Sequence, residues 1–191
     1  MNTVHTLQEY VDALRDAGIL TGCTVPEALL GRGVECLTYD TRTLRENALF
    51  ICKGAHFKEE YLRDALSRGA FAYVAEQQHD VDAPCILVSD IRYSLVVLGQ
   101  LFYDHVTDKL TSIGITGTKG KSTTAYYVRY ILNDWLRAQD RNECAILSSI
   151  DNYDGKVSEE SHITTPEVLE LYHHFENAHE SGISHLVMEA S

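Results

Sequence analysis

The sequence lacks the features of membrane, secreted and zinc-binding proteins. It contains no run of about 18 apolar residues, so no segment is predicted to span a membrane. Residues 1–10 lack the basic segment and apolar core that form a signal peptide. The five cysteines show no Cys-x-x-Cys or Cys/His spacing, which argues against a zinc site, and unpaired cysteines are typical of a reducing compartment. We therefore expect a cytoplasmic protein.

Positive charge is also scarce, with 16 lysines and arginines against 28 acidic residues and a formal net charge of −12. A non-specific nucleic-acid binder needs the opposite balance, because lysine and arginine neutralise the phosphates. No nucleic-acid partner is therefore expected. A single bound phosphate group is compatible with this charge, because backbone N–H groups at a helix N-terminus can hold an anion on an acidic protein.

Predicted strands alternate with predicted helices along most of the chain, which indicates an α/β fold with parallel sheets. Pro166 is expected at the first position of the last helix, with Thr165 as its cap. A polar stretch around residues 105–110 predicts a boundary near 108, between domains 1–107 and 108–191. The predicted strands are 34–39, 48–52, 71–75, 85–88, 111–116, 145–148 and 183–188, and the main helices are 7–17, 59–68, 92–103, 121–138 and 166–181.

The segment TSIGITGTKGKSTT, residues 111–124, predicts a phosphate-binding loop between a strand and a helix. Its glycines let successive N–H groups point at phosphate oxygens, and the helix N-terminus adds partial positive charge. Lys121, the predicted catalytic residue, is expected to bridge the β- and γ-phosphates of ATP, and the Ser122 hydroxyl to bind Mg²⁺. The predicted ATP-binding residues are Gly117, Thr118, Lys119, Gly120, Lys121, Ser122 and Thr123.

One position of this loop departs from the general motif. The pattern requires a glycine five residues before Gly120, and Ile115 stands there. Gly114 is one place too early, and Gly117 takes over its role in a shorter loop. The alternative interpretation is a glycine-rich turn that only joins a strand to a helix.

A second signal is Glu189, which ends an apolar strand. Open α/β sheets bind their ligands at the carboxyl ends of strands. We therefore expect Glu189 to hold Mg²⁺, directly or through water, together with Ser122. The alternative is an exposed acid at the end of a strand, with no ligand.

The residues 116–123 resemble the ATP loop of the Mur ligases, which carry this shortened form of the motif. The loop alone leaves other members of that superfamily open, including folylpolyglutamate synthases. Three further stretches resemble the tripeptide synthetases of the family, the MurE type. They are Tyr39-Asp40-Thr41-Arg42 with residues 48–54, Thr164-Thr165-Pro166, and Met188-Glu189-Ala190-Ser191.

This resemblance implies a fold and a set of substrate contacts. The fold is a small N-terminal α/β substrate-binding domain followed by the start of a P-loop, parallel-sheet ATPase domain. In the family, the N-terminal domain binds the uridine diphosphate end of the substrate, the Thr-Thr-Pro motif contacts the muramoyl peptide, and the glutamate of the third stretch coordinates Mg²⁺. The implied substrate-binding residues are Thr41, Arg42, His56, Thr164, Thr165 and Ser191.

The implied reaction is an ATP-dependent amide ligation of peptidoglycan synthesis. ATP phosphorylates the terminal carboxylate of UDP-N-acetylmuramoyl-L-alanyl-D-glutamate, and the amine of a diamino acid displaces phosphate from the acyl phosphate. Lys121 and Mg²⁺ are expected to offset the repulsion between the two anions. Lys119 stands where many family members have asparagine, and this variant is associated with the lysine-adding branch. L-lysine is therefore favoured over meso-diaminopimelate.

The chain stops at Ser191, directly after a predicted strand. It lacks the family's carbamylated lysine, a further metal-binding histidine and the C-terminal domain. We therefore expect the N-terminal part of a longer, monomeric enzyme, inactive by itself and without a membrane partner. Two alternatives remain open: another ligase of the superfamily, and a non-catalytic module in which ATP controls a partner interaction.

Several other residues have a plainer interpretation. His173 and His174 are expected at the surface or at a helix cap. Trp135 and the tyrosines at 126, 127 and 130 are expected to pack along the long helix 121–138.

Overall fold

The computed structural model describes residues 3–54, 57–161 and 163–191. The chain divides into two compact units, one up to Asp104 and the other from His105. This division falls three residues before the predicted boundary at 107/108. The buried Val106 belongs to a short 3₁₀ helix, η1 (Val106–Lys109), which packs against a helix of the second unit. Among the described residues, no helix is long and apolar enough to cross a membrane.

The first unit is a twisted sheet with the strand order β1-β5-β4-β3-β2. Strands β2 to β5 run parallel to one another, whereas β1 is antiparallel to β5. The sheet is therefore mixed, and the expectation of parallel pairing throughout is wrong for its edge strand. The elements are α1 (Leu7–Asp16), β1 (Leu20–Cys23), α2 (Glu27–Leu30), β2 (Cys36–Thr38), β3 (Ala48–Ile51), α3 (Glu59–Ser67), β4 (Ala70–Ala75), β5 (Cys85–Val88) and α4 (Ile91–Phe102).

The core of this unit lies on both faces of the sheet, because the side chains of each strand alternate between the two faces. Phe50 packs in one apolar cluster with Leu62 and Ala65 of α3. Its neighbours Leu49 and Ile51 are fully buried on the other face of β3, because side chains alternate along a strand. A sheet with helices over both faces needs such strands, apolar at every position. Because β2 to β5 run parallel to one another, their carboxyl ends lie at the same edge of the sheet.

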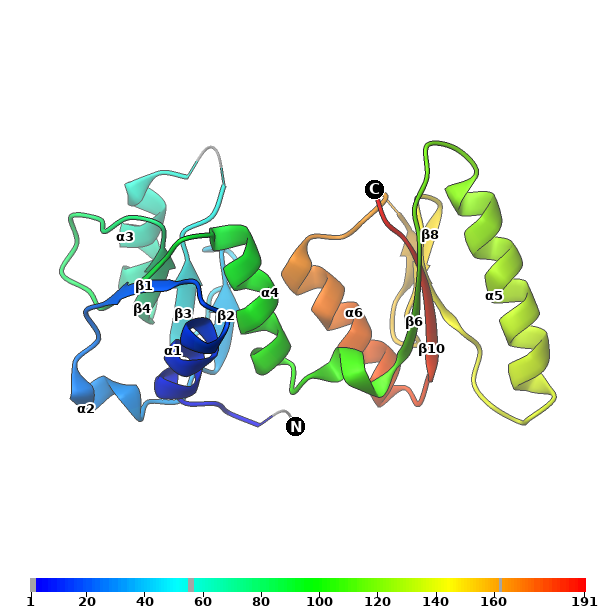
Figure 1. Cartoon of the computed structure of the whole chain (residues 1–191), viewed down its shortest axis with the longest axis horizontal. Helices are drawn as coiled ribbons and strands as arrows, with labels where there is room; N and C mark the ends of the chain where they lie inside the picture. The colour runs from blue at the N-terminus through cyan, green and yellow to red at the C-terminus, as the bar shows by residue number, and fades with distance from the viewer. Residues whose placement is uncertain (1–2, 55–56, 162) are drawn as a thin grey trace. The chain divides into compact units, whose positions relative to one another are not determined.

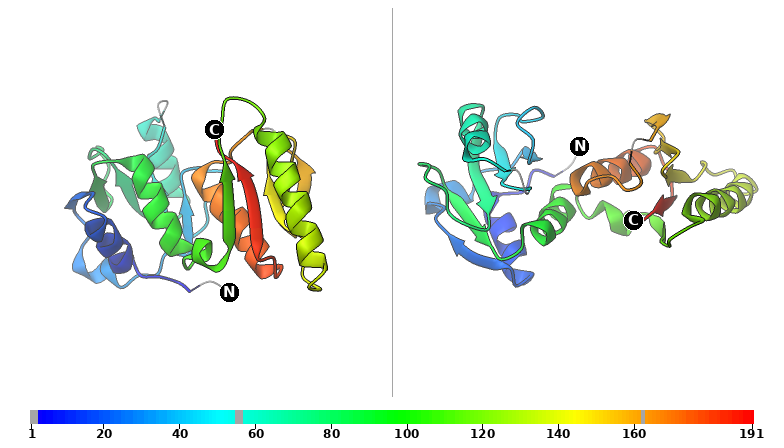
Figure 2. Two further views of the ribbon diagram at one scale, coloured as in Figure 1. Left: turned by 45° about the vertical axis from the view of Figure 1, so that its right-hand side comes forward. Right: turned by 90° about the horizontal axis from the view of Figure 1, so that it is seen from above.

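The second unit has the strand order β6-β10-β7-β8-β9. Strands β6, β10 and β7 are parallel, and β7, β8 and β9 form antiparallel pairs. Helix α5 covers one face of the sheet and α6 covers the other (Figures 1 and 2). The predicted α/β fold is confirmed, but this sheet is also mixed, so the expectation of a parallel sheet is wrong for β8 and β9. The elements are β6 (Thr111–Ile115), α5 (Lys121–Arg137), β7 (Ala145–Leu147), β8 (Asp151–Tyr153), β9 (Ser158–Glu160), α6 (Val168–Glu180) and β10 (His185–Glu189).

Helix α6 begins later than predicted. Its first residue is Val168 and its cap is Glu167, whose backbone is extended. Pro166 is therefore not the first helical residue, and Thr165 does not cap the helix. The Thr165 hydroxyl instead donates a hydrogen bond to the backbone oxygen of Glu189, at 3.1 Å. This tertiary bond ties the segment before α6 to the end of β10.

Three of the four aromatic residues of α5 do not pack as expected, whereas Tyr126 packs against the apolar cluster beneath the helix. Tyr127, Tyr130 and Trp135 are 67%, 74% and 49% exposed. The helix is held on the sheet by Ala125 and Leu136, with Val128 and Leu132 between them. These four positions recur every three or four residues and so form one stripe, which leaves Tyr127 and Tyr130 on other faces of the helix.

His174 is buried rather than at the surface, being 4% exposed. It belongs to a polar network around the fully buried carboxylate of Asp154, in the turn between β8 and β9. The Asp154 Oδ2 atom lies 2.7 Å from His174 Nδ1 and accepts a hydrogen bond from Asn177 Nδ2 at 2.9 Å. Its Oδ1 atom accepts from the backbone N–H groups of Lys156 and Val157. This network attaches the β8–β9 hairpin to α6.

We expect replacement of Asp154 by alanine to reduce the free energy of unfolding by about 3 kcal/mol, because it leaves buried donors unpaired. Burial by itself raises the pKa of Asp154, but the N–H of Val157 and the side chains of Asn177 and His174 lower it below its ordinary value. A lowered folded-state pKa stabilises the protein above the unfolded-state pKa of about 3.9, and this contribution is lost as pH falls through the folded-state value.

Urea unfolding at pH 7 and at several lower pH values measures both effects. Lys156→Ala is the matched control, because the exposed Lys156 side chain pairs only with Glu180 while its backbone N–H is retained. Equal unfolding midpoints for Asp154→Ala and the control at pH 7 would contradict the assigned role of this network.

Candidate functional site

The predicted phosphate loop lies between β6 and α5 and is exposed to solvent. Gly117 and Gly120 have φ angles of 151° and 77°, a region that other residues rarely adopt. Among the described residues, no acceptor binds the N–H groups of residues 118–123. The loop therefore presents a row of backbone donors at the N-terminus of a 17-residue helix, the arrangement that binds phosphate.

Lys121 is the first residue of α5, and its side chain turns back over the loop. The Nζ atom donates a hydrogen bond to the backbone oxygen of Gly117, at 3.1 Å. The ammonium group thus lies over the same loop, whose N–H groups have no acceptor in the described part of the chain. Thr118, Lys119 and Thr123 are exposed beside it.

Ser122 and Glu189 are brought together, as the sequence predicts. The Ser122 hydroxyl donates to Oε2 of Glu189 at 3.1 Å. Glu189 is fully buried, unlike the exposed acid of the alternative interpretation. The contact between Ser122 and Glu189 depends on the register of the strands. β10 lies between β6 and β7, and Glu189 pairs with Ile115, the last residue of β6.

The sequence analysis missed one member of this cluster, Ser149. Its backbone N–H and its hydroxyl both donate to Oε1 of Glu189, at 2.9 and 3.2 Å. The Ser149 and Ser122 hydroxyl oxygens lie 3.0 Å apart. Ser149 directly follows the predicted strand 145–148, so the rule that ligands bind at carboxyl ends of parallel strands could have identified it.

The donor set fits Mg²⁺. This ion prefers oxygen ligands at 2.0–2.1 Å in an octahedron, where adjacent ligands are about 3 Å apart. The Ser122 hydroxyl and Glu189 Oε2 have this spacing, at 3.1 Å. The described residues contain no group of three or more His, Cys, Asp or Glu side chains that could enclose a metal ion. The site thus resembles those in which Mg²⁺ has one carboxylate ligand and takes its other ligands from water and phosphate.

The predicted substrate residues of the second unit lie beside this cluster. Thr165 Oγ1 is 3.1 Å from the Ser191 hydroxyl and accepts a hydrogen bond from the Ser191 N–H. Thr165 also donates to the backbone oxygen of Glu189. Thr164 is half-buried in the same segment. Thr165 and Ser191 therefore lie together, next to the acid that the sequence assigns to Mg²⁺.

The predicted substrate residues of the first unit line a separate cavity of about 560 Å³. Thr41 and Arg42 lie on one side of it, with Lys53 and Tyr61 among the other lining residues. His56 lies outside the described residues. The cavity is at the edge formed by the carboxyl ends of β2 and β3, where an α/β sheet binds ligands.

Two cations line this cavity. The Arg42 guanidinium binds the Asp40 carboxylate, with Nη2 at 2.6 Å from Oδ2, and this hydrogen bond lowers the pKa of Asp40. Lys53 Nζ lies 4.6 Å from the centre of the Tyr39 ring. The Arg42 side chain is 87% exposed, so it can reach an anionic ligand from this position.

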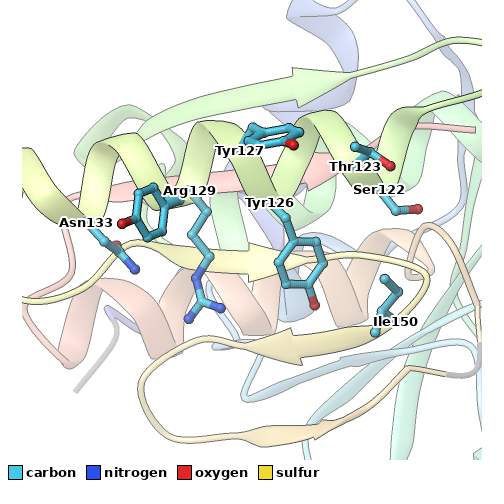
Figure 3. A pocket seen from close by; sticks show the side chains of 8 residues that line it. Ser122, Thr123, Tyr126, Tyr127, Arg129, Asn133 and Ile150 are labelled. Atoms are coloured by element: carbon cyan, nitrogen blue, oxygen red, sulfur yellow. The ribbon is translucent and has the colours of Figure 1, made fainter.

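Another cavity, of about 600 Å³, lies beside α5. It extends from Ser122 and Thr123 along the helix, and Ile150 lies at its end near Ser122 (Figure 3). Tyr126 and Arg129 point from α5 toward the β8–β9 hairpin (Figure 3). The Tyr126 hydroxyl donates to Asp151, which connects α5 to the segment that carries Ser149.

Comparison with known proteins matches residues 115–191 to the family model of the Mur ligase middle domain. The chain is 41% identical over 170 residues to the UDP-N-acetylmuramoyl-L-alanyl-D-glutamate–L-lysine ligase of Enterococcus faecalis, covering 88% of this chain and 33% of that protein. It is 42% identical over 162 residues to the UDP-N-acetylmuramyl-tripeptide synthetase of Ligilactobacillus salivarius, covering 82% and 31%. The chain thus spans about a third of the length of these relatives.

Solved structures show the same fold. A UDP-N-acetylmuramoyl-L-alanyl-D-glutamate–2,6-diaminopimelate ligase aligns with a TM-score of 0.72 and 20% identity, over 99% of this chain and 36% of that one. The MurF protein of Acinetobacter baumannii aligns with a TM-score of 0.57 and 18% identity, over 98% and 36%.

The loop geometry predicts different effects for alanine at Gly120 of the loop and at Gly114 of the preceding strand. Gly120→Ala should cost about 1 kcal/mol of stability, because alanine is strained at a φ of 77°. The same variant should bind inorganic tripolyphosphate more weakly, because the loop N–H groups are displaced. Gly114→Ala is the control, since this strand residue has no positive φ and a methyl group there meets no atom within 4 Å. Urea unfolding and calorimetric titration measure both quantities, and equal losses in the two variants would contradict this account.

Proposed function

We propose that this chain is a member of the Mur ligase family and forms the nucleotide- and substrate-binding part of an ATP-dependent ligase of peptidoglycan synthesis. The proposed reaction adds L-lysine to UDP-N-acetylmuramoyl-L-alanyl-D-glutamate through an acyl phosphate. ATP and Mg²⁺ are the proposed cofactors. The protein is proposed to be cytoplasmic and monomeric, with the nucleotide-linked dipeptide and the amino acid as its partners.

The observation that carries this proposal is the pairing of Ser122 with the buried Glu189, 3.1 Å apart, beside a loop of unpaired N–H groups. A hydroxyl and a carboxylate oxygen suit Mg²⁺, and the N–H groups suit the phosphates of ATP. Lys121, now bonded to the Gly117 oxygen, can exchange that carbonyl for a phosphate oxygen without leaving the loop. Bound Mg²⁺ supplies positive charge that offsets the repulsion between ATP and the carboxylate to be phosphorylated.

The remaining residues take substrate roles in this proposal. Thr41, Arg42 and His56 bind the uridine diphosphate end in the first unit. Arg42 suits a diphosphate, because its guanidinium donates paired hydrogen bonds to phosphate oxygens. The muramoyl peptide is assigned to Thr164, Thr165 and Ser191.

The choice of amino acid rests on relatives named as L-lysine ligases, among them that of Enterococcus faecalis. The diaminopimelate ligase among the solved structures is only 20% identical and supports the fold alone. Because the chain spans about a third of the relatives' length, we expect these 191 residues to bind substrates without completing the ligation.

The first test is calorimetric titration of the 191-residue chain with UDP-N-acetylmuramoyl-L-alanyl-D-glutamate and, separately, with Mg-ATP. We expect both to bind. Arg42→Ala should weaken binding of the uridine ligand about tenfold or more, because a charge-assisted hydrogen bond contributes roughly 1.5–3 kcal/mol. Lys121→Ala should weaken only Mg-ATP binding.

Arg63→Ala is the control for Arg42, because Arg63 is an exposed arginine of the same unit that pairs with Glu59. Binding of Mg-ATP without any binding of the uridine ligand would refute the substrate assignment. It would favour another ligase of the superfamily or a regulatory module.

The second test addresses the amino acid. With the whole protein that contains this chain, ATP-dependent amide formation should be faster with L-lysine than with meso-diaminopimelate at equal concentration. ADP release, measured with each amino acid and with none, gives the rates. A preference for meso-diaminopimelate would reverse this part of the proposal and leave the nucleotide site unaffected.

A further inference from the structure

The segment that follows β7 is a rigid turn built on Ser148. This side chain is fully buried, and its hydroxyl oxygen accepts hydrogen bonds from the N–H groups of Ile150 and Asp151, each at 3.1 Å. The hydroxyl also donates to the backbone oxygen of Asp151 at 2.9 Å. Local bonds of this kind stabilise a serine turn, here between the paired strands β7 and β8. Ser149 is the residue of this turn that directly follows Ser148, and it contacts Glu189.

The turn is also fixed to the helix that begins at the phosphate loop. The Tyr126 hydroxyl of α5 donates to the Asp151 carboxylate. Ser122 lies one helical turn before Tyr126, on the same side of α5. The position of Ser149 relative to Ser122 is therefore set by two connections, one through the sheet and one through Tyr126.

The two oxygens of Glu189 have different partners. Oε1 accepts from the Ser149 N–H at 2.9 Å and from the Ser149 hydroxyl at 3.2 Å. Oε2 accepts from Ser122 at 3.1 Å. A terminal carboxylate rotates easily, because its last torsion has broad minima. Two donors on Oε1 restrict this rotation and keep Oε2 directed at Ser122.

We propose that Ser149 is a positioning residue of the Mg²⁺ site: it holds Glu189 Oε1 so that Oε2 and the Ser122 hydroxyl face the same ion. This inference rests on the proposed function, because it takes that ion to be the Mg²⁺ of Mg-ATP. Partners that orient a metal ligand typically change metal affinity by 10–100-fold when they are removed. Ser149 itself is exposed, and its backbone N–H also donates to Oε1, so removal of the hydroxyl leaves one donor on that oxygen.

The test measures the affinity of the chain for ATP in excess Mg²⁺ and in EDTA. The first affinity divided by the second is the ratio that reports the contribution of the ion. Ser149→Ala removes the hydroxyl but keeps the backbone N–H. We expect this variant to lower the ratio about tenfold, at the lower end of the range for residues that orient metal ligands. Its affinity in EDTA and its Tm without Mg²⁺ should remain those of the wild type.

Ser149→Thr retains a hydroxyl and should restore the ratio. Ser158→Ala, at an exposed serine of β9, should leave it unchanged. An unchanged ratio in Ser149→Ala would overturn the inference, and so would equal losses of affinity with and without Mg²⁺, which indicate a structural role only. If the wild-type chain shows no Mg²⁺-dependent ATP binding, the proposed function itself fails, and the unaltered chain reveals that failure.

Discussion

The second unit depends on a carboxylate buried at the end of a strand. Glu189 is fully buried, and a charged group removed from water is costly unless hydrogen bonds replace the lost hydration. Its donors come from Ser122 at the start of α5 and Ser149 after β7. The same carboxylate therefore connects β10 to the helix N-terminus and to the turn after β7.

The proposed phosphate loop is compatible with an acidic chain. The net charge of −12 belongs to the whole molecule, whereas a phosphate responds to the groups within a few ångströms of it. Within that distance are the loop N–H groups, the start of α5 and the Lys121 ammonium. Glu189 adds a negative charge beside the same loop, and the proposed Mg²⁺ would offset that charge together with the charge of the phosphates.

Local sequence patterns gave correct predictions where one short segment decides the outcome. The start of α5 at Lys121 follows from the glycine-rich loop, and the family assignment followed from four such segments. Predictions from these patterns were wrong where a tertiary contact overrides the local conformational preference of the segment. Thr165 and Pro166 look like a helix start, yet the Thr165 hydroxyl binds the end of β10. His174 lies in a mostly polar stretch but is buried against Asp154, 20 residues earlier.

The sequence by itself therefore determined the α/β class, the phosphate loop and the identity of the acid beside it, because these depend on residue types at short spacing. Only the tertiary structure decided the strand register that brings Glu189 to Ser122. It also decided the role of Ser149, whose partner is 40 residues away. Register and long-range hydrogen bonds arise from the packing of the whole sheet, and no spacing within one segment encodes them.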